Sequence, residues 1–370
     1  MPPENNNKPE SGLWKDYLNR ASISKIAGEI GRVHKGFDQS SFVESLSNDA
    51  FSRLELKQRI FKIAEALRDF LPTDYSRVMN IFRKIAPNLG GFENWALMSY
   101  IELFGLEHFD ISVDAMRDLT QYSSAEFAIR PYVNRDPAKM LSVMSMWAEN
   151  SNEHIRRLAA EGSRPRGVWT AHIEQFKKDP RPVIKLLEKL KADESLYVRK
   201  AVANNLNDIS KDHPALVIKT ATVWQKDRHK HTDWIIKHAC RTLIKKGDPR
   251  VFSLLGFTAN PKIALRGLTL SPKKIKIGSD ATISFEVVSL GKSAQKLAID
   301  YRIHFVKKSG KLSPKVFKLT EKKLAADGVL AIATKHSLRN HSTRTHLPGK
   351  HQLDIVVNGK VFETVEFRLI

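Results

Sequence analysis

Two glutamates, Glu126 and Glu161, lie 35 residues apart, each in a segment that also contains arginine. Glu161 belongs to HIRRLAAEGSRPRGVW (residues 154–169), which contains four arginines. Glu126 belongs to TQYSSAEFAIRPYV (residues 120–133). A pair of carboxylates beside basic residues needs an explanation, because attraction for an anionic partner alone would disfavour it.

The residues alone leave two interpretations open. In the first, Glu126 pairs with Arg130, four positions further on, and Glu161 pairs in a similar way with Arg157 or Arg164. In the second, the arginines hold a nucleic-acid backbone while Glu161 faces a sugar. Paired carboxylates stabilise the oxocarbenium-like sugar that forms when a glycosidic bond breaks, and one of them can activate water. A base alkylated on a ring nitrogen is cationic and leaves without a general acid, and basic surroundings keep both carboxylates ionised.

The elements that position these residues are repeated helices. EHIRRLAAE, LYVRKAVAN and DWIIKHACR, at residues 153–161, 196–204 and 233–241, align without gaps at spacings of 43 and 37 residues. This period is typical of HEAT-type helix pairs, which stack into a solenoid with a concave binding face.

One stripe of each helix, at positions i, i+3 and i+7, begins with a ring-bearing residue followed by a basic one. The stripes are His154, Arg157 and Glu161; Tyr197, Lys200 and Asn204; and Trp234, Lys237 and Arg241. They predict a ladder of cations and rings for phosphates and sugars, with ordinary solvated helix faces as the alternative. The same register, carried back to Leu119, Tyr122 and Glu126, predicts Glu126 on a neighbouring helix, about 10 Å from Glu161.

Composition and charge limit the class of protein. The chain has 370 residues, a formal net charge of +21 and one cysteine, Cys240, which we expect in the core. One cysteine excludes an internal disulfide framework and fits the cytoplasm. No apolar run reaches the ~18 residues of a membrane-spanning helix. The excess positive charge favours a polyanionic partner, nucleic acid before an acidic membrane surface.

The sequence changes character near residue 260. Before it, apolar residues recur at helical spacing, whereas residues 281–290, 298–306 and 351–359 alternate with a period of two. Asn-Gly within VNGKVF is a strong hairpin signal. We predict a flexible tail at residues 1–10, an all-α HEAT-like helical-repeat solenoid at 11–257 and a small all-β sandwich at 258–370.

The smaller domain carries much of the charge. Residues 261–370 contain 21 Lys and Arg against 8 Asp and Glu, a net charge of +13, so we expect this domain to contact the same polyanion. Arg339 and Arg344 lie in KHSLRNHSTRTHLPGKH, the loop that we expect to anchor the domain to phosphates.

Two histidine patterns raise the question of a metal site. His336, His341, His346 and His351 recur at intervals of five without the short ligand pairs of zinc sites. His229 and His231 form an H-x-H pair, which we interpret as facing phosphate rather than ligating a metal. We therefore predict no metal site. The sequence also lacks a Walker-type loop and a nucleophile elbow, although its many lysines leave a Schiff-base lyase open.

Three stretches carry a family resemblance. SSAEFAIRPYV, HIRRLAAEGSRPRGVW and YVRKAVANNLNDISKDHP are similar to the signature segments of the AlkC-type alkylpurine DNA glycosylases, in the AlkD-like group of HEAT-repeat enzymes. The chain resembles the form that has a C-terminal immunoglobulin-like domain. The resemblance implies that Glu126 and Glu161 are the catalytic carboxylates and that Trp169 contacts DNA. Gly167 departs from the pattern, which has an apolar residue there, and this bears on the orientation of Trp169.

The resemblance also implies a reaction: hydrolytic excision, without a cofactor, of N3-alkylated bases such as 3-methyladenine, with 3-methylcytosine as a further candidate. It implies a base that stays in the duplex, and a β-domain that holds the DNA from the minor groove. We expect a monomer, nucleoid-associated when bound to alkylated double-stranded DNA. The alternatives are a non-catalytic HEAT-repeat protein that binds bent or damaged DNA, and a scaffold for an acidic protein. The residues that we expect to contact DNA are Trp169, His154, Arg157, Arg164, Arg166, Tyr197, Arg199, Lys200, Asn204, Trp234, Lys237, Arg241, Arg339 and Arg344.

Overall fold

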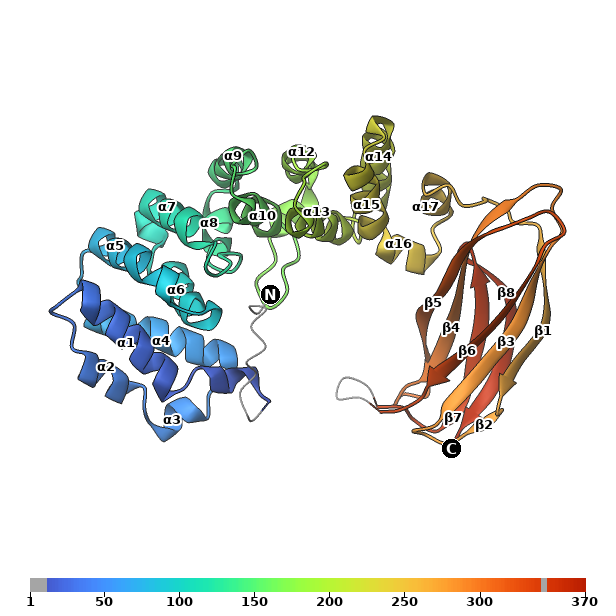
Figure 1. The fold of residues 1–370 in the computed structure, drawn as a ribbon, viewed down its shortest axis with the longest axis horizontal. Coiled ribbons are helices and arrows are strands. Elements are labelled where there is room, and N and C mark those ends of the chain that lie inside the picture. Colours follow the sequence, from blue (N-terminus) through green and yellow to red (C-terminus); the bar gives the residue numbers. More distant parts are fainter. Residues whose placement is uncertain (1–11, 341–344) are drawn as a thin grey trace. The chain divides into compact units, whose positions relative to one another are not determined.

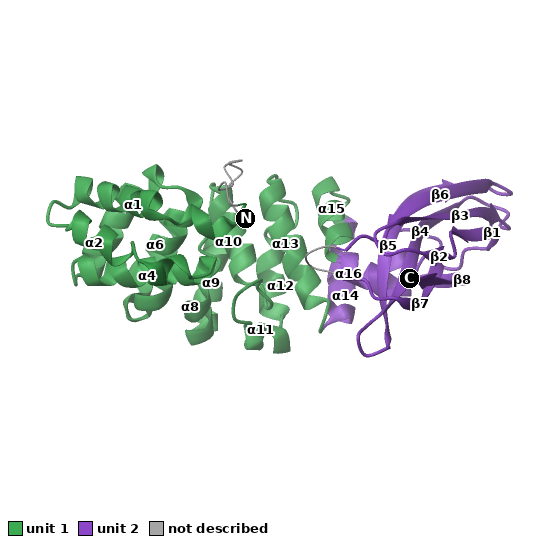
Figure 2. Ribbon diagram, turned by 90° about the horizontal axis from the view of Figure 1, so that it is seen from below, with its two compact units in different colours: residues 1–212, 227–239 green, residues 213–226, 240–370 purple. Residues whose placement is uncertain are grey.

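The computed structural model describes residues 12–340 and 345–370, so the tail predicted at residues 1–10 lies outside the described residues. The chain divides into two compact units (Figure 2). One extends to Asp212 and includes Asp227–Ala239, and the other comprises His213–Lys226 and Cys240–Ile370. Because the units interleave in the sequence, the domain boundary at residue 257 stays a prediction.

The first unit is helical (Figure 1). Its helices are α1 (Arg20–Val33), α2 (Gln39–Ser45), α3 (Asp49–Ser52), α4 (Leu56–Phe70), α5 (Tyr75–Ile85), α6 (Gly91–Phe104), α7 (Phe109–Leu119), α8 (Arg130–Arg135), α9 (Pro137–Trp147), α10 (Glu153–Gly162), α11 (Glu174–Lys178), α12 (Arg181–Glu188), α13 (Leu196–Ile209) and α15 (Lys230–Ala239). Short 3-10 segments are η1 (Trp14–Tyr17), η2 (Ala86–Asn88) and η3 (Leu106–His108). Among the described residues, no helix is long and apolar enough to cross a membrane.

Helices α10, α13 and α15 contain the three aligned segments and pack against one another in succession. Local sequence sets where they begin, because a polar side chain must satisfy the free N–H groups of a first turn. Asn152 accepts a hydrogen bond from the backbone N–H of His154 at the start of α10, and Ser195 accepts one from Tyr197 at the start of α13. The prediction of repeated, successively packed helices is therefore confirmed.

The second unit combines three described helices with a β-sandwich. The helices are α14 (Pro214–Trp224), α16 (Arg241–Lys246) and α17 (Pro249–Leu254), and the strands are β1 (Ile263–Ser271), β2 (Lys274–Ile275), β3 (Asp280–Ser289), β4 (Gln295–Val306), β5 (Leu312–Leu324), β6 (Val329–Ser337), β7 (Gly349–Val357) and β8 (Lys360–Leu369). One sheet has the order β1-β3-β6 and the other β2-β8-β7-β4-β5, with all pairs antiparallel except β2 with β8. The three predicted strands correspond to β3, β4 and β7.

The sandwich core comes from alternating positions of these strands, as the period of two requires. Its buried members include Ile283, Phe285, Val287, Leu297, Ile299, Ile303, Leu353, Ile355 and Val357. Cys240 is buried as predicted, and burial raises the pKa of its thiol to about 12.

Asn358 and Gly359 form the predicted two-residue turn between β7 and β8. Their φ values are 47° and 80°, as a type I′ turn requires. Asn358 Oδ1 accepts a hydrogen bond from Ala298 N at 2.7 Å, and its Nδ2 donates to Thr258 O at 2.8 Å. A side chain at Gly359 would lie 2.6 Å from Phe252, so glycine also permits close packing at this turn.

Candidate active site

Glu161 lies in the last turn of α10, and its side chain is only 9% exposed. The helix packs its apolar face, with Ile155 and Leu158, into the core. A carboxylate is unfavourable at a helix C-terminus because the helix dipole is negative there. Two arginines compensate for this: Arg157 Nη2 lies 3.6 Å from Glu161 Oε2, and Arg164 Nη1 donates to Glu161 Oε1.

Glu126 does not lie on a helix. It lies in the turns between α7, which ends at Leu119, and α8, so its predicted helical position is wrong. Its Oε2 atom accepts a hydrogen bond from Ser124 Oγ at 3.1 Å and pairs with Arg157 Nη2 at 2.6 Å. Its other oxygen, Oε1, accepts no hydrogen bond from any described part of the chain. Since the Glu126 side chain is 19% exposed, it is the more accessible of the two carboxylates.

One guanidinium joins both carboxylates. Arg157 Nη2 lies 2.6 Å from Glu126 Oε2 and 3.6 Å from Glu161 Oε2. The two carboxylates are therefore closer together than the separation of about 10 Å predicted from the sequence. Arg157 also donates to Ser124 Oγ, and its Cζ atom lies 4.9 Å from the centre of the Tyr197 ring. Although burial lowers the pKa of Arg157, the two carboxylates raise it by more, so the guanidinium stays charged.

The same contacts keep Glu126 ionised. Burial raises the pKa of this carboxyl, but the charge and hydrogen bond of Arg157, with a further hydrogen bond from Ser124, bring the pKa below its usual value. The ion-pair interpretation is therefore right for Glu161, which pairs with both expected arginines. It has the wrong partner for Glu126, which pairs with Arg157 rather than Arg130.

Further charged groups hold this pair in place. Arg164 Nε donates to Asp208 Oδ2 of α13 at 2.8 Å while Nη1 of the same side chain holds Glu161. Arg130 Nη1, from α8, donates to the backbone carbonyl of Arg164 at 2.6 Å. Burial lowers the pKa of Arg130 to about 10, against the opposing charge of Glu161. The network therefore connects α8, α10 and α13 around the carboxylate pair.

The side chain of Arg130 lies close to Gly167. A Cβ atom at residue 167 would lie 2.6 Å from Arg130 Nη2 and would also collide with Thr170 Cγ2. An apolar side chain at this place would therefore require Arg130 and Thr170 to shift. Glycine avoids both collisions.

Trp169 projects from the segment between α10 and α11, and at 71% exposure it is more exposed than any other large apolar side chain in the described residues. Its φ of 60° is unusual for a bulky residue, so its surroundings must hold it. Lys57 Nζ, from α4, donates to Trp169 O at 3.2 Å and lies 5.6 Å from the centre of the Phe127 ring. Lys57 therefore connects Trp169 to the residue that follows Glu126. Sequence reasoning missed it, because no local signal pairs residues 112 positions apart.

The predicted row of rings lies on α10, α13 and α15. The rings of His154 and Tyr197 meet edge to face at 5.7 Å. Trp234 stacks on His238 with 5.0 Å between ring centres, and Arg199 Cζ lies 5.9 Å from the Trp234 ring. These rings are only partly buried, and their contact with DNA stays a prediction.

Several arginines predicted to contact phosphates are engaged by the protein itself. Arg157 and Arg164 are buried among carboxylates and hold them in place, and their direct contact with DNA stays a prediction. Arg166 is half-buried and binds Asp212 through Nε and Nη2 at 3.1 and 2.8 Å. Arg199 donates to two backbone carbonyl groups just before α13.

The predicted stripe of the third repeated helix is incorrect at its last residue, Arg241. Helix α15 ends at Ala239, and Arg241 is the first residue of α16, so Arg241 does not continue the face of Trp234 and Lys237.

The remaining predicted contacts differ in exposure. Lys200 and Asn204 are half-buried, Lys237 and Arg339 are exposed, and Arg344 lies outside the described residues. Lys200 has neither an ion pair nor a hydrogen bond with any residue that the structure describes, which leaves its ammonium available for an anion.

Two family models match separate parts of the chain. Residues 120–243, which contain both glutamates, match a model described as a DNA alkylation repair enzyme. Residues 264–370 match the C-terminal Ig-like domain of the uncharacterised protein YhaZ. The fold and the paired carboxylates thus define a helical-repeat protein of the DNA alkylation repair class, followed by an immunoglobulin-like sandwich.

Comparisons over the whole chain narrow this class. The chain is 41% identical over 355 residues to the uncharacterised protein YhaZ of Bacillus subtilis, covering 96% of this chain and 99% of YhaZ. It is similar in structure to the Pseudomonas fluorescens alkylpurine DNA glycosylase AlkC bound to DNA containing an abasic site analogue. That match has a TM-score of 0.93 and 37% identity, over 97% of this chain and 99% of AlkC. The chain belongs to the AlkC family of alkylpurine DNA glycosylases, as the sequence resemblance predicted.

Proposed function

We propose that this protein hydrolyses the N-glycosidic bond of N3-alkylated bases in double-stranded DNA, with 3-methyladenine as the first candidate and 3-methylcytosine as the second. The observation that carries the proposal is the sharing of Arg157 by Glu126 and Glu161, in a chain of the AlkC family. No cofactor is needed, because a base alkylated on its ring nitrogen already carries the positive charge that makes it leave.

In the proposed reaction the bond between C1′ and the base nitrogen breaks, and its electron pair leaves with the base, which becomes neutral. The sugar acquires oxocarbenium character, which a nearby carboxylate stabilises. Glu126 takes this part because it is the more accessible carboxylate and its Oε1 atom has no partner in the described residues. Water then adds to C1′ and gives its proton to Glu126. This revises the expectation that Glu161 faces the sugar.

In this proposal Glu161 positions other charged groups. It is held by Arg157 and Arg164, so it fixes the guanidinium that orients Glu126. It also adds negative potential where the positive sugar forms. The buried arginines prevent the two carboxylates from repelling each other, since like charges at this spacing would otherwise raise a pKa.

The surface around the pair supports duplex DNA as the partner. Trp169 is exposed on a segment that Lys57 connects to Phe127, the residue after Glu126. Lys200 and Lys237 lie on the repeated helices. A large exposed ring at this place fits a duplex that is gripped at its backbone while the damaged base stays stacked. We propose on this ground that the base is not flipped. A fluorescent base next to the lesion tests this: flipping increases its emission, and stacking leaves the emission unchanged.

The experiment that separates an enzyme from a DNA-binding module is the release of free bases. Purified protein is incubated with methylated duplex DNA, and the released bases are separated and identified. The proposal expects free 3-methyladenine in amounts that grow with time. Binding of methylated DNA without release would instead support the non-catalytic alternative.

A further inference from the structure

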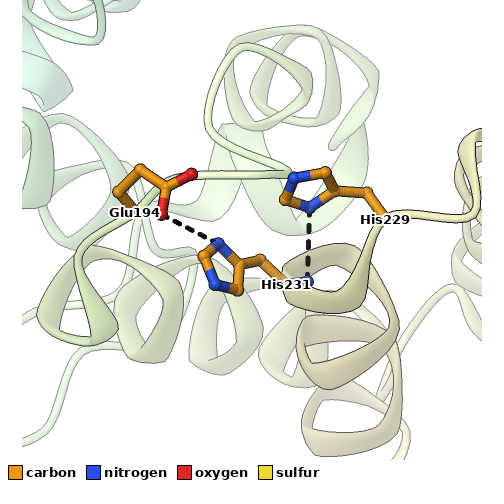
Figure 3. Close-up of side chains that lie close together, drawn as sticks. All are labelled: Glu194, His229 and His231. Atoms are coloured by element: carbon orange, nitrogen blue, oxygen red, sulfur yellow. Dashed lines mark hydrogen bonds and ion pairs between the residues drawn. The ribbon is translucent and has the colours of Figure 1, made fainter.

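A second cluster of chemically active side chains lies apart from the carboxylate pair, within the first unit (Figure 3). It consists of Glu194, from the loop before α13, and of His229 and His231, from the segment that enters α15. Each offers one ligand atom, and these atoms all lie within 4.8 Å of one another. Two imidazoles and a carboxylate are a common set of metal ligands.

The two segments are held independently of any ligand. Arg199 Nη1, from α13, donates to Glu194 O at 2.8 Å. Thr232 Oγ1, in the first turn of α15, donates to Lys191 O at 2.8 Å and so ties this turn to the chain that leads to Glu194. His231 N donates to His229 Nδ1 at 3.3 Å, which fixes the two histidines relative to each other. The cluster therefore follows from backbone geometry.

One ring nitrogen in the cluster makes no hydrogen bond, although a carboxylate lies near it. His231 Nδ1 is buried and makes no hydrogen bond, in a side chain that is 13% exposed. The nearest carboxylate oxygen, Glu194 Oε2, lies 3.6 Å away, beyond hydrogen-bond distance. A buried polar atom without a partner destabilises a fold. Two ligands of one tetrahedral zinc ion lie about 3.4 Å apart, which is close to this separation.

We propose that Glu194, His229 and His231 bind a divalent transition-metal ion of the zinc class, with water completing the coordination. Nitrogen-rich donor sets favour zinc over magnesium or calcium. A phosphate, the partner expected for the two histidines from the sequence, fits less well because the Glu194 carboxylate would repel it. The Glu194 side chain is 84% exposed and therefore free to rotate towards the ion.

The repeat gives the site a structural role. His231 lies 37 residues after Glu194, the same offset that relates Trp234 to Tyr197, so the ion would join equivalent positions of neighbouring repeats. Two of the ligands, Glu194 and His231, each precede by three residues an aromatic side chain of the proposed DNA surface. The ion would thus fix the spacing of the Tyr197 and Trp234 rings. This proposal does not depend on the glycosylase reaction.

The test uses the full chain, produced without a histidine tag and freed of metal by a chelator. Zinc is titrated in competition with a chromophoric chelator. The proposal expects one equivalent bound, with affinity at least about tenfold lower in Glu194→Gln and in His231→Ala. His172→Ala is the matched control. His172 lies 3.9 Å from Glu174 and belongs to no group of three potential ligands in the described residues, so its loss should leave zinc affinity unchanged.

Two further readouts keep the test decisive. Cobalt should give visible absorption bands in the wild type that His231→Ala loses. Zinc should raise the thermal midpoint of the wild type and of His172→Ala, but not that of Glu194→Gln or His231→Ala. Circular dichroism checks that each variant is folded, and Glu194→Gln changes an exposed side chain. Zinc binding that all three variants retain would overturn the proposal. So would a wild type that takes up no zinc while His231→Ala weakens DNA binding, which would assign the histidines to phosphate.

Discussion

Replacement of Arg157 by methionine tests the arrangement that joins the two carboxylates. The guanidinium is 8% exposed and pairs with Glu126 at 2.6 Å and with Glu161 at 3.6 Å. Methionine has a similar length and no charge, so it removes the cation without leaving a large cavity. The variant therefore isolates the electrostatic part of the contact.

The magnitude follows from the burial of the partners. Removing one partner of a buried ion pair costs about 3–5 kcal/mol, because the remaining charge is left uncompensated. Glu126 is reached by some water, which favours the lower end, about 3 kcal/mol. For a domain of this size, each kcal/mol lowers the midpoint by about 2–4 °C, so we expect a decrease of about 9 °C. Arg181→Met is the control: its pair with Asp179 is exposed and should cost less than about 1 kcal/mol.

Replacement of Arg157 should reverse the direction in which the ionisation of Glu126 makes stability depend on pH. In the wild type the pKa of folded Glu126 is below its usual value, so the ionised group stabilises the fold above its unfolded pKa. This stabilisation is lost as pH falls through the folded pKa. Without Arg157, burial remains and raises the folded pKa above the unfolded value of about 4.3. The variant should then become more stable as pH falls from 7 to about 5.

The assay is denaturant unfolding of both proteins at several pH values, with the double variant Glu126→Gln/Arg157→Met included. The double variant should recover part of the lost stability, because it no longer buries an unpaired charge. A wild-type-like stability at pH 7, or a variant whose stability does not rise between pH 7 and pH 5, would refute the reasoning.

Three further predictions concern single side chains. Gly167→Ala should lower stability by about 1–3 kcal/mol through collision with Arg130, whereas Gly28→Ala, in open space on α1, should raise it by up to about 1 kcal/mol; thermal unfolding compares the two. Lys200→Ala should reduce the slope of log affinity for DNA against log salt by about 0.9, measured by fluorescence anisotropy, and an unchanged slope would exclude a phosphate contact there. Asn358→Ala should cost about 1–3 kcal/mol in denaturant unfolding, since it removes the hydrogen bonds to Ala298 and Thr258 and places alanine at positive φ.

Much of the fold could be predicted because local signals and packing agree. The repeated apolar spacing gave α10, α13 and α15, and the polar side chains before α10 and α13 cap their first turns. The Asn-Gly pair gave the turn at Asn358 and Gly359, where positive φ angles are required. Such features depend on residues close together in the chain.

The geometry of the candidate site could be predicted only in part. Both glutamates were identified, but the helical register carried past Leu119 placed Glu126 on a helix, whereas the chain there forms turns. The prediction also assigned Arg157 to DNA, because a basic residue on a helix stripe is usually solvated. Its burial depends on Glu126, which arrives from a separate segment.

The remaining features depend on contacts between distant segments. The sequence around Lys57 does not indicate that its ammonium binds the backbone carbonyl of Trp169. The sequence around Glu194 likewise does not indicate that its Oε2 atom lies 3.6 Å from His231 Nδ1. The sequence shows that Gly167 departs from the family pattern, but it does not show that the Arg130 side chain lies against this residue. Tertiary packing decides these contacts, and a single sequence does not carry it.

The central claim is that the carboxylate of Glu126 stabilises the sugar while a base is released. Single-turnover release of 3-methyladenine from methylated duplex DNA tests it most directly, with wild type and Glu126→Gln compared and DNA affinity measured alongside. We predict release about 100-fold slower or more in the variant, with affinity equal or higher because a negative charge is removed from the DNA surface. Release at the wild-type rate by a folded, DNA-bound variant would contradict the account.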